Sequence, residues 1–412
     1  MLSHGIPTHD IFTYTASAFP WVNHEWGSDV LLAMLYQLGG YGLLIGVYAA
    51  IWTAALFMRN SRSSLVAMLL VATALIPYAG VREFAWTLLC FTICLRILES
   101  KHPQTAYLII PLTLLWANLH GGFIMSFALT GYFMLRKRSW RLALILIASI
   151  LVTFINPYGV HLYEEIFRTL GDSQLHRRIQ EWYIMSFELP SMIVVSCWIA
   201  AFILLYKQWW RRLLDLGPIL LAGAISASRN LPFLAIYIMP DFDKIHQYVL
   251  SHIPGTRQRL RKRATIILAS IGCSIVVICT LFASFTAANS KTEYPQSTLA
   301  YLRAHPCQGN LFAHYNYGGY LIWQLPGVKL FIDGRMPSWR DEQGVSYYDR
   351  HQAIFYDPAA RKREFSTYNI RCVLIPREGI GTKLASDLKK EGWRRVSTDT
   401  GTQLLIAPLQ AK

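Results

Sequence analysis

Residues 111–152, PLTLLWANLHGGFIMSFALTGYFMLRKRSWRLALILIASILV, decide the fold class of this chain. They contain three apolar runs separated by two short links, one at His-Gly-Gly and one at the basic stretch RKRSWR. A bilayer core takes about 20 mostly apolar residues per helix. The segment therefore predicts successive helices that cross a membrane, with one link on each side.

Most of the chain is apolar in the same way. Its 412 residues are 53% hydrophobic and 15% charged, whereas a soluble globular chain carries about 25% charged residues. The mean hydropathy is +0.31. These values exclude a disordered chain and argue against an ordinary soluble enzyme. The predicted spans, about nine or ten helices with the last pair before 264 interrupted by prolines, are 41–58, 63–79, 84–98, 104–119, 121–135, 142–155, 191–206, 214–226, 230–240 and 264–286.

The fold class that follows is a polytopic α-helical membrane domain followed by an extracytoplasmic α/β domain. We expect the membrane domain over residues 1–286, with external loops at 1–27 and 156–190, and the α/β domain over 287–412. In the second region short apolar strands alternate with helical patterns, which is typical of an α/β layer. Helices are expected at 294–305, 345–356, 358–368 and 381–392, strands at 310–315, 328–334, 371–376 and twice within 393–408, and a helix or a strand at 318–325.

Basic residues give the orientation. The formal charge is +15. Seventeen Lys and Arg lie on links that would face one side, from Arg59 to the run Arg257–Arg263, and five lie on links that would face the other. Cytoplasmic loops are enriched in Lys and Arg, so the first side is cytoplasmic and both the N-terminus and the C-terminal domain are extracytoplasmic. Most of the excess positive charge is thus explained by the orientation of the helices in the membrane. Nucleic acid is therefore not expected as a partner.

Two further features bear on the topology. The chain starts with the polar stretch MLSHGIPTHDIFTYT, so either helix 41–58 inserts with its N-terminus outside unaided, or a first helix lies upstream; we expect the second. A disulfide between Cys307 and Cys372 is possible if their stretch lies outside the cytosol.

Candidate site residues lie on the predicted external loops. No Walker loop, GxGxxG, HExxH or GxSxG motif occurs. His24 and Glu25 lie between two tryptophans, a setting that favours either base chemistry or the start of an interfacial helix. Asp10 is a second candidate carboxylate for base chemistry. The alternative is an aspartate that only caps a helix or forms a turn. Arg229 lies beside a proline-interrupted helix and could bind a phosphate or be a loop-tip charge. The other candidates on the same face are Asn118, His120, Glu181 and Arg82. For Arg82 the alternative is an ion pair with its neighbour Glu83.

In the C-terminal domain, Asp333 and Arg335 follow the predicted strand 328–334. Ligands of open α/β sheets often bind at the carboxyl ends of strands. The alternative is an Asp-Gly turn with a salt-bridged arginine.

Several stretches carry a resemblance: residues 6–40, WANLHGGF (116–123), FINPYG (154–159), IQEW (179–182), SRNLPFLAIYIMP (228–240) and YNYGGYLIWQLPGVKLFIDGR (315–335). They resemble a group of bacterial polytopic proteins related to the GT-C glycosyltransferases, which include oligosaccharyl and protein mannosyl transferases. The resemblance implies a multi-pass protein of the bacterial inner membrane that takes a sugar from a polyprenyl-phosphate donor. It also implies transfer outside the cytoplasm at a carboxylate of the first external loop.

The sequence departs from this group at its start. The group usually carries a first helix and then an Asp-rich, Trp-His segment, and this sequence contains neither. Asp10 and the His24–Glu25 pair match later parts of the loop. The usual catalytic carboxylate is therefore in doubt.

The hypothesis is that Glu25 or Asp10 removes the proton of an acceptor hydroxyl, while Arg229 and either His120 or Arg82 bind the donor phosphate. The acceptor is an unknown glycan, lipid or protein. A divalent metal could assist, although no clear ligand set is visible. The alternative is a non-enzymatic or truncated, inactive membrane scaffold whose external domain binds a partner or glycan. A transporter is less favoured, because the sequence shows no internal repeat and its polar residues cluster at the outer boundary.

Overall fold

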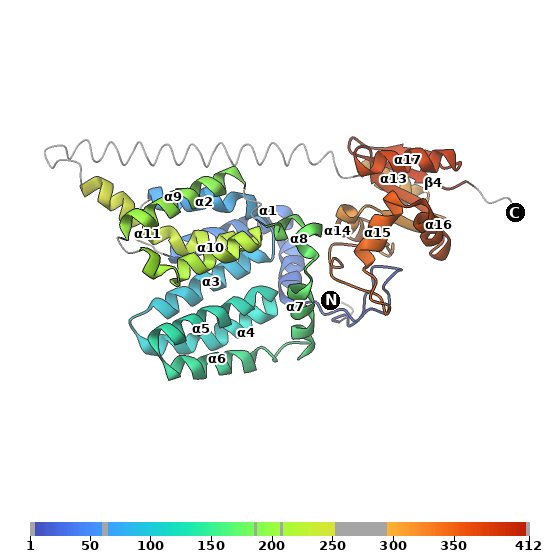
Figure 1. The fold of residues 1–412 in the computed structure, drawn as a ribbon. Helices are drawn as coiled ribbons and strands as arrows, with labels where there is room; N and C mark the ends of the chain where they lie inside the picture. The colour runs from blue at the N-terminus through green and yellow to red at the C-terminus, as the bar shows by residue number, and fades with distance from the viewer. Residues whose placement is uncertain (1–4, 60–64, 185–187, 207–208, 252–294, 409–412) are drawn as a thin grey trace. The chain divides into compact units, whose positions relative to one another are not determined.

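The computed structural model describes residues 5–59, 65–184, 188–206, 209–251 and 295–408. The chain is mostly helical, with a long apolar helix near the N-terminus and a small α/β sheet region near the C-terminus (Figure 1). It divides into two compact units. The helical unit comprises Met1–Ile6 and Val22–Leu281, and the α/β unit comprises Pro7–Trp21 and Phe282–Lys412.

Apolar helices with short links build the helical unit. Helix α1 is kinked where Gly39 and Gly40 leave the helical conformation, Gly40 with a φ of +58° that favours glycine. The turn in RKRSWR ends one helix at Arg138, and Ser139 begins the next by accepting a hydrogen bond from the Leu142 amide. The helices are α1 Trp26–Arg59, α2 Leu65–Leu75, α3 Phe84–Glu99, α4 Ile109–Leu119, α5 Ile124–Lys137, α6 Trp140–Val152, α7 His161–Gly171, α8 Leu175–Arg178, α9 Leu189–Leu205, α10 Leu216–Ser226 and α11 Leu231–Ser251.

Short 3₁₀ helices make many of the links. They are η1 Ile76–Tyr78, η2 Pro103–Leu108, η3 Gly121–Phe123, η4 Gln180–Trp182, η5 Trp209–Arg212 and η6 Ser228–Asn230. Helix α3 lies at the centre of the packing, where Leu88, Phe91 and Leu95 are fully buried. At its C-terminal end, Glu99 forms a two-pronged ion pair with Arg59 of α1 at 2.5 and 3.1 Å. The two helices are therefore joined both by apolar packing and by charge.

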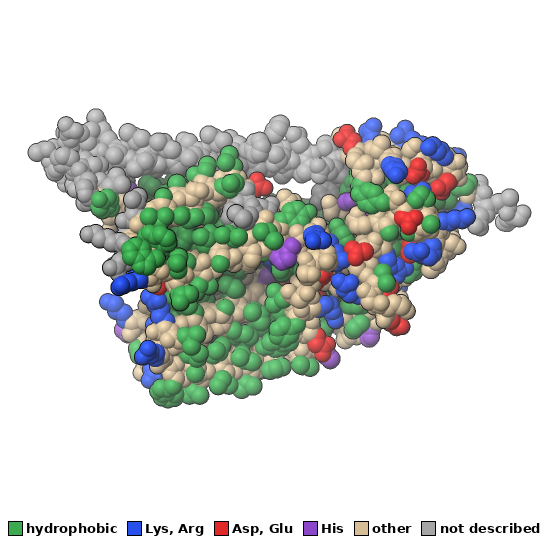
Figure 2. All heavy atoms as spheres, in the orientation of Figure 1, with side chains coloured by type: hydrophobic (Ala, Val, Ile, Leu, Met, Phe, Trp, Pro, Cys, Tyr) green, Lys and Arg blue, Asp and Glu red, His purple; other side chains and the backbone are tan. Residues whose placement is uncertain are grey.

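Apolar side chains also cover the outside of the helical unit (Figure 2). Leu144, Ile147 and Leu151 of α6 are more than half exposed, and a large exposed apolar surface is typical of a membrane or partner contact. Among the described helices, α1 alone is long and apolar enough to cross a bilayer, while Leu65–Tyr78, Trp140–Val152, Ser191–Ile203 and Leu216–Ser226 are apolar but shorter. The other predicted spans stay predictions. Span 264–286 and the basic run before it lie outside the described residues.

A four-stranded sheet organises the α/β unit, in the order β1-β2-β4-β3. Strand β1 pairs parallel with β2, and β4 pairs antiparallel with both β2 and β3. The expected helices and four of the five expected strands are present, and residues 318–324 are helical. The elements are α13 Gln296–Ala304, β1 Asn310–Ala313, η8 Tyr315–Tyr317, α14 Gly318–Gln324, α15 Tyr347–Tyr356, α16 Pro358–Thr367, β2 Ile370–Pro376, α17 Ile380–Lys390, β3 Arg394–Thr398 and β4 Thr402–Ile406.

The strand predicted at 328–334 is wrong. Only Leu330 makes isolated bridges, with Thr13 and with Leu311. The N-terminal segment binds here: the Tyr14 amide donates to the Leu330 carbonyl at 3.0 Å, and the Leu330 amide donates to the Phe12 carbonyl at 2.9 Å. Residues 7–21 thus belong with the α/β unit, although the sequence placed them in an external loop of the membrane domain.

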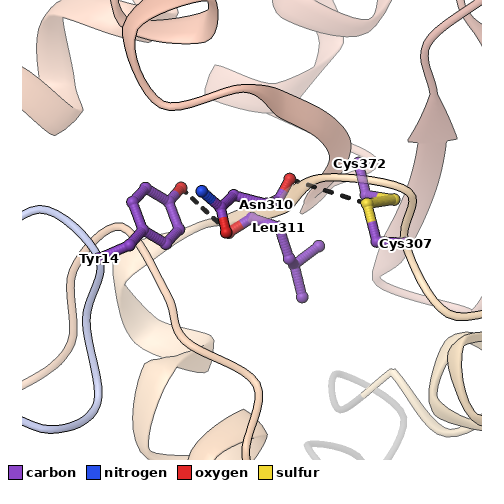
Figure 3. The surroundings of a disulfide bond; sticks show 5 residues. All are labelled: Tyr14, Cys307, Asn310, Leu311 and Cys372. Carbon is purple, nitrogen blue, oxygen red and sulfur yellow. Dashed lines mark hydrogen bonds between the residues drawn. A yellow bond between two sulfur atoms is a disulfide. The ribbon is translucent and has the colours of Figure 1, made fainter.

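Cys307 and Cys372 form a disulfide (Figure 3). Cys372 is buried in β2, opposite Leu311 of β1. The Tyr14 hydroxyl donates to the Leu311 carbonyl at 3.2 Å, as Figure 3 shows. The disulfide therefore attaches the segment before β1 to β2, while the Tyr14 hydrogen bond attaches the N-terminal segment to β1.

Candidate functional site

Four helix ends of the helical unit meet at one group of charged side chains. Glu25 immediately precedes α1, and Glu83 is the N-terminal cap position of α3. His120 lies between α4 and η3, and Arg229 lies in η6 just before α11. The ends of these helices position the charged residues, while the apolar helices behind them form the core.

The two glycines after His120 allow this close approach. A Cβ atom on Gly121 would lie 2.9 Å from the His24 ring, and one on Gly122 would lie 2.5 Å from the Thr87 hydroxyl oxygen and 2.9 Å from His120 Nδ1. Such distances do not leave room for a side chain. The His-Gly-Gly break in the sequence thus lets the α4–η3 junction pack against α3 and the start of α1.

Hydrogen bonds fix the orientation and protonation of His120. Its Nδ1 accepts from the Gly122 amide at 2.9 Å and lies 2.8 Å from the Thr87 hydroxyl. The Trp116 indole donates to that hydroxyl oxygen at 2.8 Å, so the hydroxyl proton is directed to Nδ1. The remaining ring nitrogen, Nε2, therefore carries the proton and lies 3.2 Å from Glu25 Oε1. Burial lowers the pKa of His120 to about 4, which keeps the ring neutral at pH 7.

Glu25 is the fixed negative charge of the site. His24 Nε2 lies 3.5 Å from the same oxygen that His120 contacts. Burial raises the pKa of Glu25, but the neighbouring His24, His120 and Arg229 outweigh burial and lower the pKa to about 2. Burial likewise lowers the pKa of His24, yet Glu25 more than compensates and the pKa of His24 is raised. Glu25 is consequently ionised at neutral pH and is a weak base.

Glu83 behaves in the opposite way. Burial, together with the like charges of Glu25 and Asp29, raises the pKa of Glu83 to about 7, although Arg82 lowers it. Glu83 can therefore gain or lose a proton near neutral pH. Two carboxyl groups whose environments drive their pKa values apart are typical of sites that separate an acid–base role from an electrostatic one.

Two arginines complete the group. Arg82 Nη2 lies 2.6 Å from Glu181 Oε1. The guanidinium of Arg229 stacks on the Trp182 ring, 4.6 Å from its centroid, and forms no ion pair within 4 Å with a described residue. Burial lowers the pKa of Arg229, while Glu181 and Glu25 oppose that effect. A partly buried arginine without a close acidic partner is suited to an anionic ligand.

These residues line two cavities. The first has a volume of about 180 Å³ and is mostly charged, with Glu25, Arg82, Glu83, Glu181 and Arg229 in its wall. The second has a volume of about 210 Å³ and is mainly apolar, with Ile124, Met125, Ile166, Leu170 and Phe233 among its lining residues. Both cavities are lined by Phe84, His120 and Arg229. A polar compartment thus adjoins an apolar one.

The structure brings together most of the residues predicted from the sequence, namely His24, Glu25, Arg82, His120, Glu181 and Arg229. Asn118 is separate from them in role: it accepts from the Trp26 indole at 3.0 Å and donates to the carbonyls of Leu114 and Ile155. Neither cavity is lined by Asn118. Its side chain joins helix ends, and we assign it no ligand.

Asp10, Asp333 and Arg335 belong to the α/β unit. Arg335 Nη2 lies 2.6 Å from Asp10 and 2.5 Å from Asp333. Its guanidinium also stacks on Phe12 and Trp21, at 4.7 and 4.4 Å from their centroids. The salt-bridged turn, one of the two interpretations of FIDGR, is thus present, and Asp10 is a member of that ion group. Asp333 does not follow a strand.

Sequence reasoning missed Glu83 and Trp182. A mutual pair of Glu83 with Arg82 is one of the two interpretations that the sequence allows, but Arg82 pairs with Glu181 and Glu83 lines the charged cavity. A glutamate at the start of an apolar run on the acid-rich face was the available signal. For metals, the described residues contain no group of three or more His, Cys, Asp or Glu placed to hold an ion.

No family model and no curated protein matches the sequence. Among solved structures, the chain is similar to the archaeal oligosaccharyltransferase AglB from Archaeoglobus fulgidus, in complex with an inhibitory peptide and a dolichol-phosphate. The TM-score is 0.54 at 12% sequence identity, over 97% of this chain and 68% of that one. At this identity the similarity bears on the fold alone: the chain and that protein share a similar fold.

Proposed function

We propose that the protein is a membrane glycosyltransferase that moves a sugar from a polyprenyl-phosphate donor to an acceptor on the extracytoplasmic face. The observation that carries this proposal is the charged cavity, where a carboxyl group with a pKa of about 7 and two arginines line the same space. The similarity in fold to a protein solved with a dolichol-phosphate supports the class of donor.

The donor phosphate binds at Arg229, with Arg82 as the second cation. Arg229 is held flat on Trp182, and its planar fork matches phosphate oxygens. The adjoining apolar cavity, with Ile124, Met125 and Phe233 in its wall, takes the first apolar part of the lipid chain. One ligand with a phosphate and a hydrocarbon end would therefore fill both compartments.

In the transfer step, the acceptor hydroxyl oxygen attacks the anomeric carbon and forms the new C–O bond. The bond from that carbon to the phosphate oxygen breaks, and the phosphate leaves with the electron pair. Glu83 in its ionised form receives the hydroxyl proton, since its pKa near 7 suits a general base. This proposal replaces Glu25 as the base, because a carboxylate with a pKa of about 2 takes up a proton poorly.

Glu25 acts instead through its charge. It raises the pKa of Glu83, and it is held in place by His120 and His24. It also faces the positive charge that develops on the sugar ring as the phosphate leaves. A divalent cation stays a prediction, so the assay is run with and without a chelator.

The test uses membranes that contain the full chain and a panel of labelled polyprenyl-phosphate sugars. We expect Arg229→Ala to reduce transfer about 10- to 100-fold, as the loss of a charged hydrogen-bonding partner of the phosphate. Arg177→Ala, at an exposed position outside both cavities, is the matched control. Unchanged transfer by Arg229→Ala removes it from the scheme, and no transfer with any donor favours the scaffold alternative.

A further inference from the structure

A third cavity lies at the opposite ends of α1 and α3. It has a volume of about 520 Å³ and is bordered by the C-terminal ends of α1, α3, α5 and α9 and by the start of α10. Helix α3 runs from one region to the other: Glu83 precedes its first residue and Glu99 is its last. At 1.5 Å per residue, the two regions are about 24 Å apart. We call this space the basic-end cavity.

The basic-end cavity has a surplus of positive charge. Its described lining includes five basic side chains, Arg59, Arg96, Arg136, Arg212 and Lys244, and three acidic ones, Glu99, Asp215 and Asp241. The surplus is two positive charges. A cavity with low-dielectric walls focuses such a charge and attracts anions.

The ion pairs show where this surplus lies. Arg59 is paired with Glu99, and Lys244 Nζ lies 2.7 Å from Asp241. Arg136 and Arg212 share one carboxylate, Asp215, at 2.7 and 3.5 Å. Arg96 is exposed and donates a long hydrogen bond, 3.5 Å, to the Arg59 carbonyl, and it has no acidic partner in the described part of the chain. The cations available to a ligand are therefore Arg96 and the pair around Asp215.

Aromatic side chains give the cavity an apolar wall. Phe133, Phe202 and Tyr206 are among its lining residues. The guanidinium of Arg212 lies 4.3 Å from the Tyr206 ring centroid, an arrangement that holds an arginine flat beside a ligand. The wall fits a ligand that joins an anionic group to an apolar body.

We propose that the basic-end cavity binds a phosphate group that carries about two negative charges. Its charge of about −1.5 to −2 at pH 7 matches the surplus of two positive charges, and arginine forks bind phosphate oxygens in pairs. The ligand is either a lipid with a phosphate monoester headgroup or a free phosphate. The site is independent of the proposed transfer reaction and of the residues that perform it.

The experiment measures binding of dioleoyl phosphatidic acid to the purified full chain by native mass spectrometry, with dioleoyl phosphatidylcholine as the neutral lipid and inorganic phosphate as competitor. We expect Arg96→Gln to weaken phosphatidic acid binding about 3- to 10-fold. Asp215→Asn should strengthen it, because it removes a competing negative charge. Arg138→Gln, an exposed basic residue at the same end of α5 but outside the cavity lining, is the control and should have no effect.

The outcomes separate the two sources. Displacement of phosphatidic acid by millimolar inorganic phosphate assigns the site to free phosphate, and resistance to displacement assigns it to the lipid headgroup. The proposal is overturned if phosphatidic acid binds no better than phosphatidylcholine, or if Arg96→Gln and Arg138→Gln weaken binding equally. Because Arg96 is exposed, its substitution leaves the packing of α3 intact, and an unchanged melting temperature confirms this.

Discussion

His120 donates its Nε2 proton toward Glu25 Oε1 over 3.2 Å while its Nδ1 accepts from the Gly122 amide. The ring thus connects the buried Thr87–Trp116 pair to the fixed negative charge of the site. Because both ring nitrogens are engaged by neutral donors or a carboxylate, the neutral imidazole is the form that satisfies every partner. The relationship makes His120 a positioning residue for Glu25.

His120→Ala should destabilise the protein more than His24→Ala. The His120 side chain is 8% exposed and its removal leaves the Thr87 hydroxyl without its acceptor, whereas the His24 side chain is 35% exposed and contacts Glu25 alone among the described ion partners. A buried group left without a partner costs about 1–3 kcal/mol. Thermal unfolding in detergent measures both variants, and equal losses would contradict the assigned network.

Glu83 should control the pH dependence of transfer. With a pKa of about 7, its ionised fraction rises through neutral pH, so the rate of the wild-type protein should increase from pH 6 to pH 8. Glu83→Gln should lower the rate about 10²- to 10⁴-fold, the usual contribution of a general base. It should also remove the inflection near pH 7. Glu83→Asp, which keeps the carboxyl group, is the matched variant and should keep the inflection.

The same carboxyl group should affect stability with the opposite sign. The folded protein holds the Glu83 proton up to pH 7, while the unfolded chain releases it near pH 4.5. Between these values the unfolded state binds fewer protons, so stability falls as pH rises. We expect Glu83→Gln to raise the melting temperature at pH 8 and to change it little at pH 4. A lower melting temperature at pH 8 would show that Glu83 is not held in an unfavourable charged state.

Gly122→Ala should disturb the site where Gly131→Ala does not. A Cβ at Gly122 would displace the Thr87 hydroxyl or the His120 ring, whereas a Cβ at Gly131 in α5 meets nothing within 4 Å. Alanine within a helix is favoured over glycine by up to about 1 kcal/mol. Gly131→Ala should therefore be neutral or stabilising, and Gly122→Ala should lose transfer activity. Comparable activity of the two variants would mean that the His120 orientation is not required.

Local patterns were sufficient for most of the α/β unit. Pro358 after Asp357 predicts the start of α16. Gly392 follows the C-terminal cap of α17 and has a φ of +86°, a conformation that favours glycine and stops the helix. Segment 328–334 has the apolar content of a strand, yet Leu330 pairs only with Thr13 and Leu311. The conformation of this segment depends on residues more than 300 positions earlier in the chain, and a local sequence pattern does not contain that information.

For the candidate site, too, the sequence predicts the positions of the residues but not their partners. Hydropathy and helix breaks placed His24, Glu25, His120 and Arg229 at helix ends on one predicted face. They did not give the partners, because neighbours in sequence such as Arg82 and Glu83 need not face each other at a helix start. Arg82 instead meets Glu181, which lies 99 positions further along the chain. Arg82 lies just before α3 and Glu181 lies in η4, so their pairing depends on how two segments far apart in the chain pack, which the local sequence does not contain.

The disulfide gives a prediction for the α/β unit and for the side of the membrane it occupies. Cys307 and Cys372 are 65 residues apart, and a cross-link over that separation stabilises the folded state by about 4 kcal/mol in the chain-entropy description. We expect Cys307→Ser to lower the melting temperature, and a reducing agent to do the same for the wild-type protein only. Cys197→Ser, at an exposed free cysteine, is the control. Thiol labelling of freshly isolated cells that finds both cysteines reduced would place the unit in a reducing compartment, against the orientation predicted from the basic loops.

Asp10→Asn tests whether Asp10, one of the two candidate bases predicted from the sequence, takes part in transfer. Asp10 is buried, accepts from the Thr13 amide at 2.9 Å and is paired with Arg335, so its loss should weaken the α/β unit by about 1–3 kcal/mol. Asp333 continues to pair with Arg335, and the arginine is not left uncompensated. Transfer measured below the melting temperature should therefore stay within about 3-fold of wild type, which corresponds to less than 1 kcal/mol. Glu378→Gln, at an exposed acidic position of the same unit, is the matched control. A loss of transfer with Asp10→Asn comparable to that with Glu83→Gln, at unchanged stability, would return the base role to Asp10.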